Sequence, residues 1–186
     1  MTQEQEEQEE KAFALWLIPG GAPLGRLQRL IEALARETGG PAFTPHLTLL
    51  GGLRGDGGAL AAKLGHLGDA RRRVELRACG PATGSAVHQC VLLDVARTEP
   101  LAALRSAAEA AFGASESPFR PHVSLVYGDL RDLRHMPAER RRALAADPRV
   151  LALGHEVWWA ERLELWSVAG ETERWRRVAG VALASP

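Results

Sequence analysis

The sequence predicts an α+β fold with two pseudo-symmetric lobes of mostly antiparallel sheet, outer helices and a cleft between the lobes. Three observations predict it. Strand-like and helix-like apolar periods alternate along the 186 residues. Several predicted strands follow one another through short turns, which favours antiparallel pairing over a doubly wound parallel sheet. One seven-residue pattern occurs twice, each time on a predicted strand that follows a helix.

The first third of the chain alternates strand and helix. A short apolar run over 12–18 predicts a strand that closes at Pro19-Gly20-Gly21. An apolar stripe over 24–37 predicts a helix that stops at the following glycines. A strand over 44–50 carries the first copy of the repeated pattern. After a glycine-rich loop, a second helix is expected over 59–67.

The middle of the chain is expected to form a hairpin, a helix and a further strand. Apolar runs over 74–78 and 87–95 predict two strands around a turn at 80–84. An amphipathic helix is expected over 101–112, with Leu101, Leu104 and Ala108 on one face. The second copy of the pattern then lies on a strand over 121–126.

The last third predicts a short helix and a closing pair of strands. Residues 137–146 read as a helix rich in arginine. The segments 156–167 and 174–183 read as strands, and together they carry four of the five tryptophans. Because terminal strands can cross over, the order along the chain does not decide which lobe holds which strand.

The two copies of the pattern, Phe43–Leu49 and Phe119–Leu125, are each centred on a histidine. Phe, Pro, His, a hydroxyl residue and Leu recur in the same order. On a strand, the histidine and the hydroxyl two residues on share one face, while the apolar residues between them enter the core. On a helix the two would lie roughly 200° apart. The four candidate catalytic residues are His46, Thr48, His122 and Ser124.

A structural explanation of the motif must be weighed against a functional one. A single His-x-Thr in an apolar strand is usually a buried histidine bonded to nearby backbone, and duplication alone could repeat it. The agreement of five positions across two copies favours function. Two histidines can act as general base and general acid near neutral pH, and two hydroxyls can donate to oxygens that gain charge. The pattern is therefore suited to phosphoester chemistry.

Charge and hydropathy limit the partners. Lys and Arg number 23 and so do Asp and Glu, whereas a protein that binds long nucleic acid by its backbone is normally basic. The arginine runs near positions 72 and 141 are therefore expected to be solvated faces. No apolar run reaches the roughly 20 residues of a membrane span. We expect a disordered acidic tail over 1–11, a single bilobal domain over 12–186, a monomer, and a cytoplasmic location.

The two cysteines and the remaining histidines show no metal or redox motif, so no metal or other cofactor is expected. Cys79 and Cys90 lie symmetrically about Gly84-Ser85. They are interpreted as packing residues, and the alternative is a labile disulfide across a hairpin that turns at that point.

The paired Pro-His-x-Thr/Ser-Leu segments resemble the signature of the 2H phosphoesterase superfamily, and within it the cyclic phosphodiesterases of the plant and fungal type. Further likeness lies in Leu15–Pro19, Gln89–Val91 and Tyr127–Asp129. The resemblance implies a bilobal fold with the active site in the cleft. It also implies metal-independent hydrolysis of a 2′,3′-cyclic nucleotide phosphate, or of ADP-ribose 1″,2″-cyclic phosphate, to a monoester. His88 departs from it, standing where an aromatic residue is common.

Three further residues are candidates for substrate binding. Tyr127 would stack on a base or bond to phosphate, or else is a half-buried strand-end aromatic. Arg120 adjoins the second motif, and Trp16 would line the cleft unless it is a core tryptophan. The expected partner is a small cyclic-phosphate nucleotide. Two alternatives remain: an enzyme of RNA ends related to the 2′-5′ RNA ligase-like branch, and a non-catalytic nucleotide-binding module.

Overall fold

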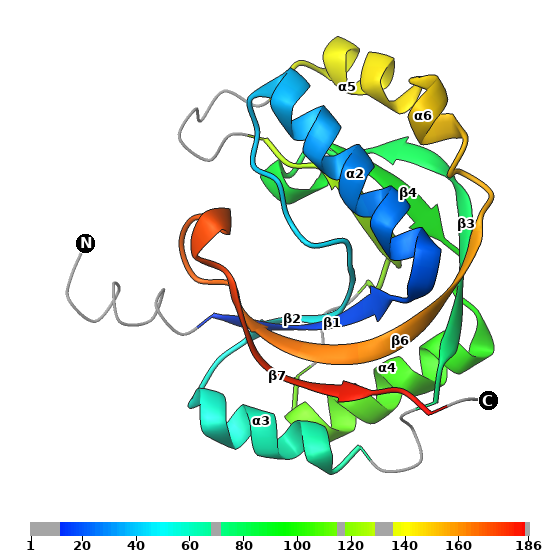
Figure 1. Ribbon diagram of the computed structural model, residues 1–186. Helices are drawn as coiled ribbons and strands as arrows, with labels where there is room; N and C mark the ends of the chain where they lie inside the picture. The colour runs from blue at the N-terminus through cyan, green and yellow to red at the C-terminus, as the bar shows by residue number, and fades with distance from the viewer. Residues whose placement is uncertain (1–11, 68–71, 115–117, 129–135, 185–186) are drawn as a thin grey trace.

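A computed structural model describes residues 12–67, 72–114, 118–128 and 136–184. Seven strands form one strongly curved sheet (Figure 1). They are β1 (Phe13–Pro19), β2 (Leu47–Leu53), β3 (Val74–Thr83), β4 (Val91–Val95), β5 (His122–Val126), β6 (Val157–Ser167) and β7 (Arg176–Ala182). Every pairing between these strands is antiparallel. The predicted α+β class with mostly antiparallel sheet is confirmed. The expected acidic tail over 1–11 lies outside the described residues.

The strands fall into two groups, each with one motif strand. The order in the sheet is β1-β2-β5-β4-β3-β6-β7, and β6 also pairs with β1. The six strands from β1 to β6 in this order therefore close into a ring, and β7 lies outside it. One group holds β1, β2, β6 and β7, and the other holds β3, β4 and β5. The groups meet where β3 pairs with β6 and where β2 meets β5. In the described residues this second contact is a single pair, Leu47 with Val123.

Helices cover the sheet from two sides (Figure 1). On one side lie α2 (Gly21–Thr38), α5 (Ala138–Ala145) and the short α6 (Pro148–Leu151), and on the other lie α3 (Gly57–Gly65) and α4 (Glu99–Phe112). The apolar stripe expected for the first helix is buried, and Leu27, Ile31 and Leu34 are fully inaccessible. The main core lies between these helices and the sheet. No helix in the described part of the chain is long and apolar enough to cross a membrane.

Each helix that precedes a motif strand packs against the other motif strand. Helix α2 leads into β2 but contacts β5, and α4 leads toward β5 but contacts β2. Two close contacts mark this exchange. Arg105 of α4 donates a hydrogen bond to the Leu49 carbonyl of β2. Just after α2, a Cβ on Gly40 would lie 2.6 Å from the Tyr127 carbonyl that follows β5.

The structure corrects the predicted hairpin. Strand β3 runs on to Thr83, and a 3₁₀ turn (Val87–Gln89) replaces the start of the next predicted strand. Thr83 pairs with Val91, so the hairpin turns later than Gly84-Ser85. The proposed opposition of Cys79 and Cys90 is therefore wrong. Both thiols are free, and only Cys90 is buried, so the packing interpretation holds for Cys90 and fails for Cys79.

Candidate active site between the motif strands

The site is built on the single pair that joins β2 to β5. We call the junction of β2 and β5 the seam. Leu47 and Val123 pair across it, and both point into the core. In an antiparallel pair the next residues on each side also lie opposite one another. Continuing the register by one residue therefore puts Thr48 beside His122 on the opposite face, and on the other side of the pair His46 beside Ser124. Each histidine thus lies next to the hydroxyl residue of the other copy.

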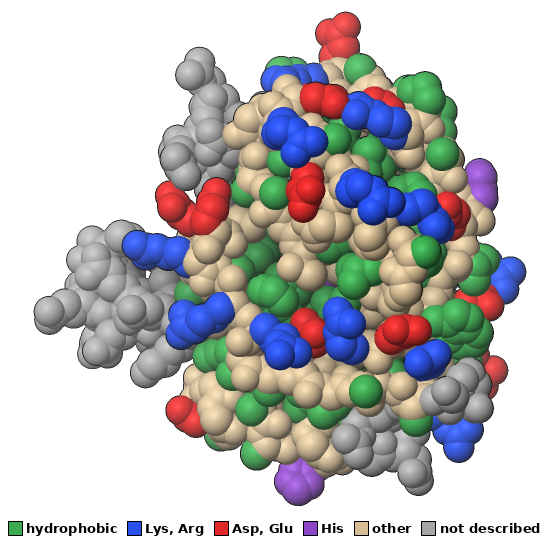
Figure 2. Space-filling model, in the orientation of Figure 1, with side chains coloured by type: hydrophobic (Ala, Val, Ile, Leu, Met, Phe, Trp, Pro, Cys, Tyr) green, Lys and Arg blue, Asp and Glu red, His purple; other side chains and the backbone are tan. Residues whose placement is uncertain are grey.

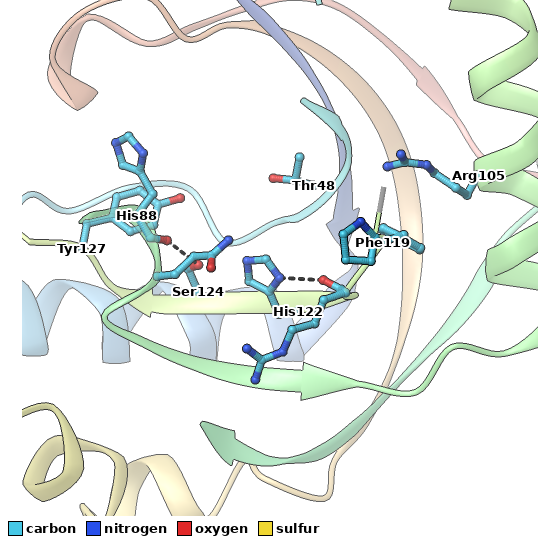
Figure 3. A pocket seen from close by; sticks show the side chains of 10 residues that line it. Thr48, His88, Arg105, Phe119, His122, Ser124 and Tyr127 are labelled. Atoms are coloured by element: carbon cyan, nitrogen blue, oxygen red, sulfur yellow. Dashed lines mark hydrogen bonds between the residues drawn. The ribbon is translucent and has the colours of Figure 1, made fainter. Parts of the chain in front are cut away.

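A cavity of about 300 Å³ opens along this seam. Thr48, His122 and Ser124 lie at its centre, with His88 and Tyr127 toward one end and Phe119 and Arg105 toward the other (Figure 3). The complete lining is Thr48, His88, Gln89, Arg105, Pro118, Phe119, Arg120, His122, Ser124 and Tyr127. Three of the four candidate catalytic residues are among them, whereas His46 lies outside the lining.

Both motif histidines are held by the same backbone contact. The Nδ1 atom of His46 lies 2.7 Å from the Thr44 carbonyl oxygen, and that of His122 lies 2.8 Å from the Arg120 carbonyl oxygen. A carbonyl only accepts hydrogen bonds, so each Nδ1 must carry the proton. The Nε2 atom of each neutral ring is then unprotonated and able to accept a proton.

The surroundings of His46 are strongly desolvating. Its side chain is only 5% exposed, and its ring stacks on Trp16 with centroids 3.5 Å apart. Burial lowers the pKa of His46 to about 3; the bond to Thr44 opposes the shift, and the charges of His122 and His88 add to it. His46 is therefore neutral at pH 7, and its Nε2 is unprotonated.

The two hydroxyl residues are bonded differently. The Ser124 hydroxyl donates a 2.9 Å hydrogen bond to the His88 carbonyl (Figure 3). Thr48 faces the cavity and makes no hydrogen bond to the described residues through its hydroxyl. Thr48 can thus donate to a bound oxyanion without breaking an existing bond, whereas Ser124 must exchange its acceptor.

The three expected substrate-binding residues occupy different places. Tyr127 lines the cavity but is buried, with its ring stacked on Phe43 at 3.7 Å, and burial raises the pKa of its hydroxyl. Arg120 lines the cavity and holds Asp94 through two hydrogen bonds. Trp16 is 2% exposed and belongs to a small cluster with Ala14 and Ile18 rather than to the cavity lining.

Arg105 is a cavity residue that the sequence reasoning missed. It is buried, forms an ion pair with Glu109 at 2.8 Å, and lies 4.7 Å from the centre of the Phe119 ring. The signal for it was present. Arginine at 105 falls on the apolar stripe of 101, 104 and 108, and a charge on such a stripe must find buried partners. No group of three or more potential metal ligands occurs among the described residues.

Comparison with known proteins identifies the family. The model of the 2′-5′ RNA ligase superfamily matches residues 19–171, most of the chain. The chain belongs to this superfamily. The predicted membership of the 2H phosphoesterases, the same group of proteins, is thereby confirmed. A cyclic phosphodiesterase from Arabidopsis thaliana is 26% identical over 148 residues, which cover 73% of this chain and 76% of the relative.

Solved structures share the fold of this chain at low identity. A protein of Thermus thermophilus superposes with a TM-score of 0.61 at 16% identity, covering 94% of this chain and 98% of that one. E. coli LigT complexed with 3′-AMP gives 0.55 at 13% identity, covering 94% and 99%. These likenesses support the fold. The activity of this 2H phosphoesterase has to be inferred from the residues of its own site.

Proposed function

We propose that the protein hydrolyses a 2′,3′-cyclic nucleotide phosphate, or ADP-ribose 1″,2″-cyclic phosphate, to a phosphomonoester by two-histidine acid–base catalysis. The observation that carries the proposal is the seam itself, where two Nδ1-anchored histidines alternate with two hydroxyls. The relative named cyclic phosphodiesterase supports the same reaction class. The cavity of about 300 Å³ is at the small end of ligand sites and suits a mononucleotide better than a polymer.

The surroundings of the two histidines suggest different roles for them. His46 is neutral, so its Nε2 takes a proton from the attacking water as a new oxygen–phosphorus bond forms. Stacking on Trp16 covers the face of the imidazole. His122 lies in the cavity wall and, in its protonated form, donates a proton to the ribose oxygen as its bond to phosphorus breaks. Thr48 and Ser124 donate to the non-bridging oxygens.

The test is turnover in excess EDTA of each 2′,3′-cyclic nucleotide and of the ADP-ribose cyclic phosphate, with products separated against authentic monoesters. His46→Ala and His122→Ala are each expected to lose on the order of 10² to 10⁴ in kcat. His155→Ala is the matched control, because that histidine is exposed and lies outside the cavity.

The possible outcomes separate the proposal from its alternatives. Turnover that survives in both histidine variants contradicts two-histidine catalysis. Turnover only of oligonucleotides that end in a cyclic phosphate points instead to an enzyme of RNA ends. Tight binding of nucleotides without any turnover points to a binding module.

A further inference from the structure

Asp94, on β4, is linked to His122 by two routes. The two residues are direct partners in the β4–β5 ladder. The Asp94 carboxylate also accepts two hydrogen bonds from Arg120, from Nε to Oδ1 at 2.9 Å and from Nη2 to Oδ2 at 3.0 Å. The carbonyl of Arg120 in turn accepts the Nδ1 proton of His122. A continuous set of contacts therefore runs from the carboxylate to the imidazole.

The first copy of the motif anchors its carbonyl in another way. Thr44 lies between two buried residues, Phe43 and Pro45, and Phe43 stacks on Tyr127. In the second copy Pro121 is buried like Pro45, but Phe119 is only partly buried and the side chain of Arg120 is 52% exposed. Packing thus holds the first carbonyl in place. The second carbonyl, that of Arg120, depends more on the ion pair that the Arg120 side chain makes with Asp94.

We propose that Asp94 is a positioning residue for the reaction, because by holding Arg120 it fixes the carbonyl that orients His122. The inference rests on the proposed function and deepens it. It gives the Arg120 side chain a task that needs no contact with substrate, because two of its five N–H donors hold Asp94. Bidentate pairing restrains a guanidinium in direction as well as distance, and a misplacement of 1 Å near the chemistry can slow a reaction about 10²-fold.

A structural role alone would look different. An ion pair as exposed as this one contributes little to stability, so its loss should leave folding nearly intact. Other charged or titratable groups also face His122: His46 just before β2, His88 from the 3₁₀ turn, Arg105 from α4 and Tyr127 after β5. Because these stay in place in an Asp94 variant, a change at His122 can be traced to the loss of the Asp94–Arg120 ion pair.

The variants are Asp94→Asn, Arg120→Ala and the double variant, each assayed for kcat and KM. Asp94→Asn and Arg120→Ala are each expected to lower kcat on the order of tenfold with little change in KM. The double variant should be no worse than either single one, because both act through the same carbonyl. Glu75→Gln is the matched control, since it removes an exposed pair with Arg77 on β3 that has no link to either histidine.

A second readout is independent of turnover. Imidazole ¹⁵N spectra, with the signals of His122 assigned from a His122→Gln sample, report which nitrogen carries the proton. In the unaltered protein at high pH the Nδ1–H form should dominate, and Asp94→Asn should shift the population toward Nε2–H. Unchanged signals overturn the proposal, whether or not the protein turns over a cyclic phosphate. A raised KM in Arg120→Ala with normal kcat also overturns it and makes Arg120 a substrate contact.

Discussion

His46 and His122 hold the same place in two copies of one motif and yet meet different environments. Each ring donates its Nδ1 proton to the carbonyl two residues earlier. The acceptor in each bond is a main-chain carbonyl, so both copies can make the same bond although Thr44 and Arg120 differ in character. The side chains around the rings then separate them, since His46 is covered by Trp16 whereas His122 faces the cavity.

Burial of neutral His46 predicts a loss of stability in acid. Its folded pKa of about 3 lies below the ordinary 6.5, so between these values the unfolded chain binds a proton that the folded chain does not. The free energy of unfolding should therefore fall as the pH drops below 6.5, by up to about 1.4 kcal/mol per pH unit from this group alone.

Urea unfolding of the unaltered protein and of His46→Gln between pH 6.5 and 4 checks this. The difference between the two stability curves should shrink steadily as the pH falls, because the variant lacks the group. Parallel curves would mean that His46 is solvated or protonated in the folded protein. His155→Gln, at an exposed histidine, should run parallel to the unaltered protein.

At the scale of single residues, the sequence predicted which side chains share a strand face but not how deeply each is buried. Alternation alone places a histidine and its hydroxyl partner together. The stacking of Trp16 on His46 depends on the register of β1 against β2, which has irregularities at Leu15 and Trp16. The catalytic roles of the four motif residues remain predictions until the variants are assayed.

Among elements, the contact between the end of α2 and the end of β5 leaves no room for a side chain. A Cβ at Gly40 would lie 2.6 Å from the Tyr127 carbonyl. Gly40→Ala should therefore destabilise the fold by about 1–3 kcal/mol and reduce activity by shifting the residues after β5. Thermal unfolding and kcat measure the two effects.

Gly65→Ala is the matched control for this prediction. A Cβ at Gly65, at the end of α3, would meet nothing within 4 Å, so the variant should be neutral or slightly more stable. Equal stability of the two variants would mean that the chain after α2 can move away from β5 at no cost.

Most elements could be predicted because their periodicity is strong, and their boundaries differ mainly by a few residues. The hairpin of β3 and β4 could not. Its register shifts between Ala78 and Pro81, and Gly80 there adopts a positive φ of 112°, so an apparent turn signal lies inside the strand. Turn residues mark a bend or bulge as readily as a hairpin end.

Over the whole molecule, acidic and basic side chains are interspersed on the face shown in Figure 2 rather than gathered by sign, in keeping with equal totals of each. A decanucleotide that ends in a cyclic phosphate should therefore gain little over a cyclic mononucleotide. We expect kcat/KM values within about threefold of each other at both about 50 and about 200 mM salt.

Steady-state assays of both substrates at the two salt concentrations check this. A strong preference for the decanucleotide at low salt that collapses at high salt would show contacts to several phosphates. The protein would then act on RNA ends. The strand order behind this surface could not be predicted from the sequence, because the closure of β6 on β1 joins segments from opposite ends of the chain.

The exchange of helices between the motif strands governs the order in which the protein is completed during synthesis. Strand β2 ends at Leu53, but α4, which backs it, begins at Glu99. During synthesis, β2 therefore emerges before the helix that packs against it, and α2 emerges before its partner strand β5. Neither motif strand can therefore be fully packed until the second half of the chain has been made. A chain that ends before β5 lacks His122 and Ser124 and cannot form the site.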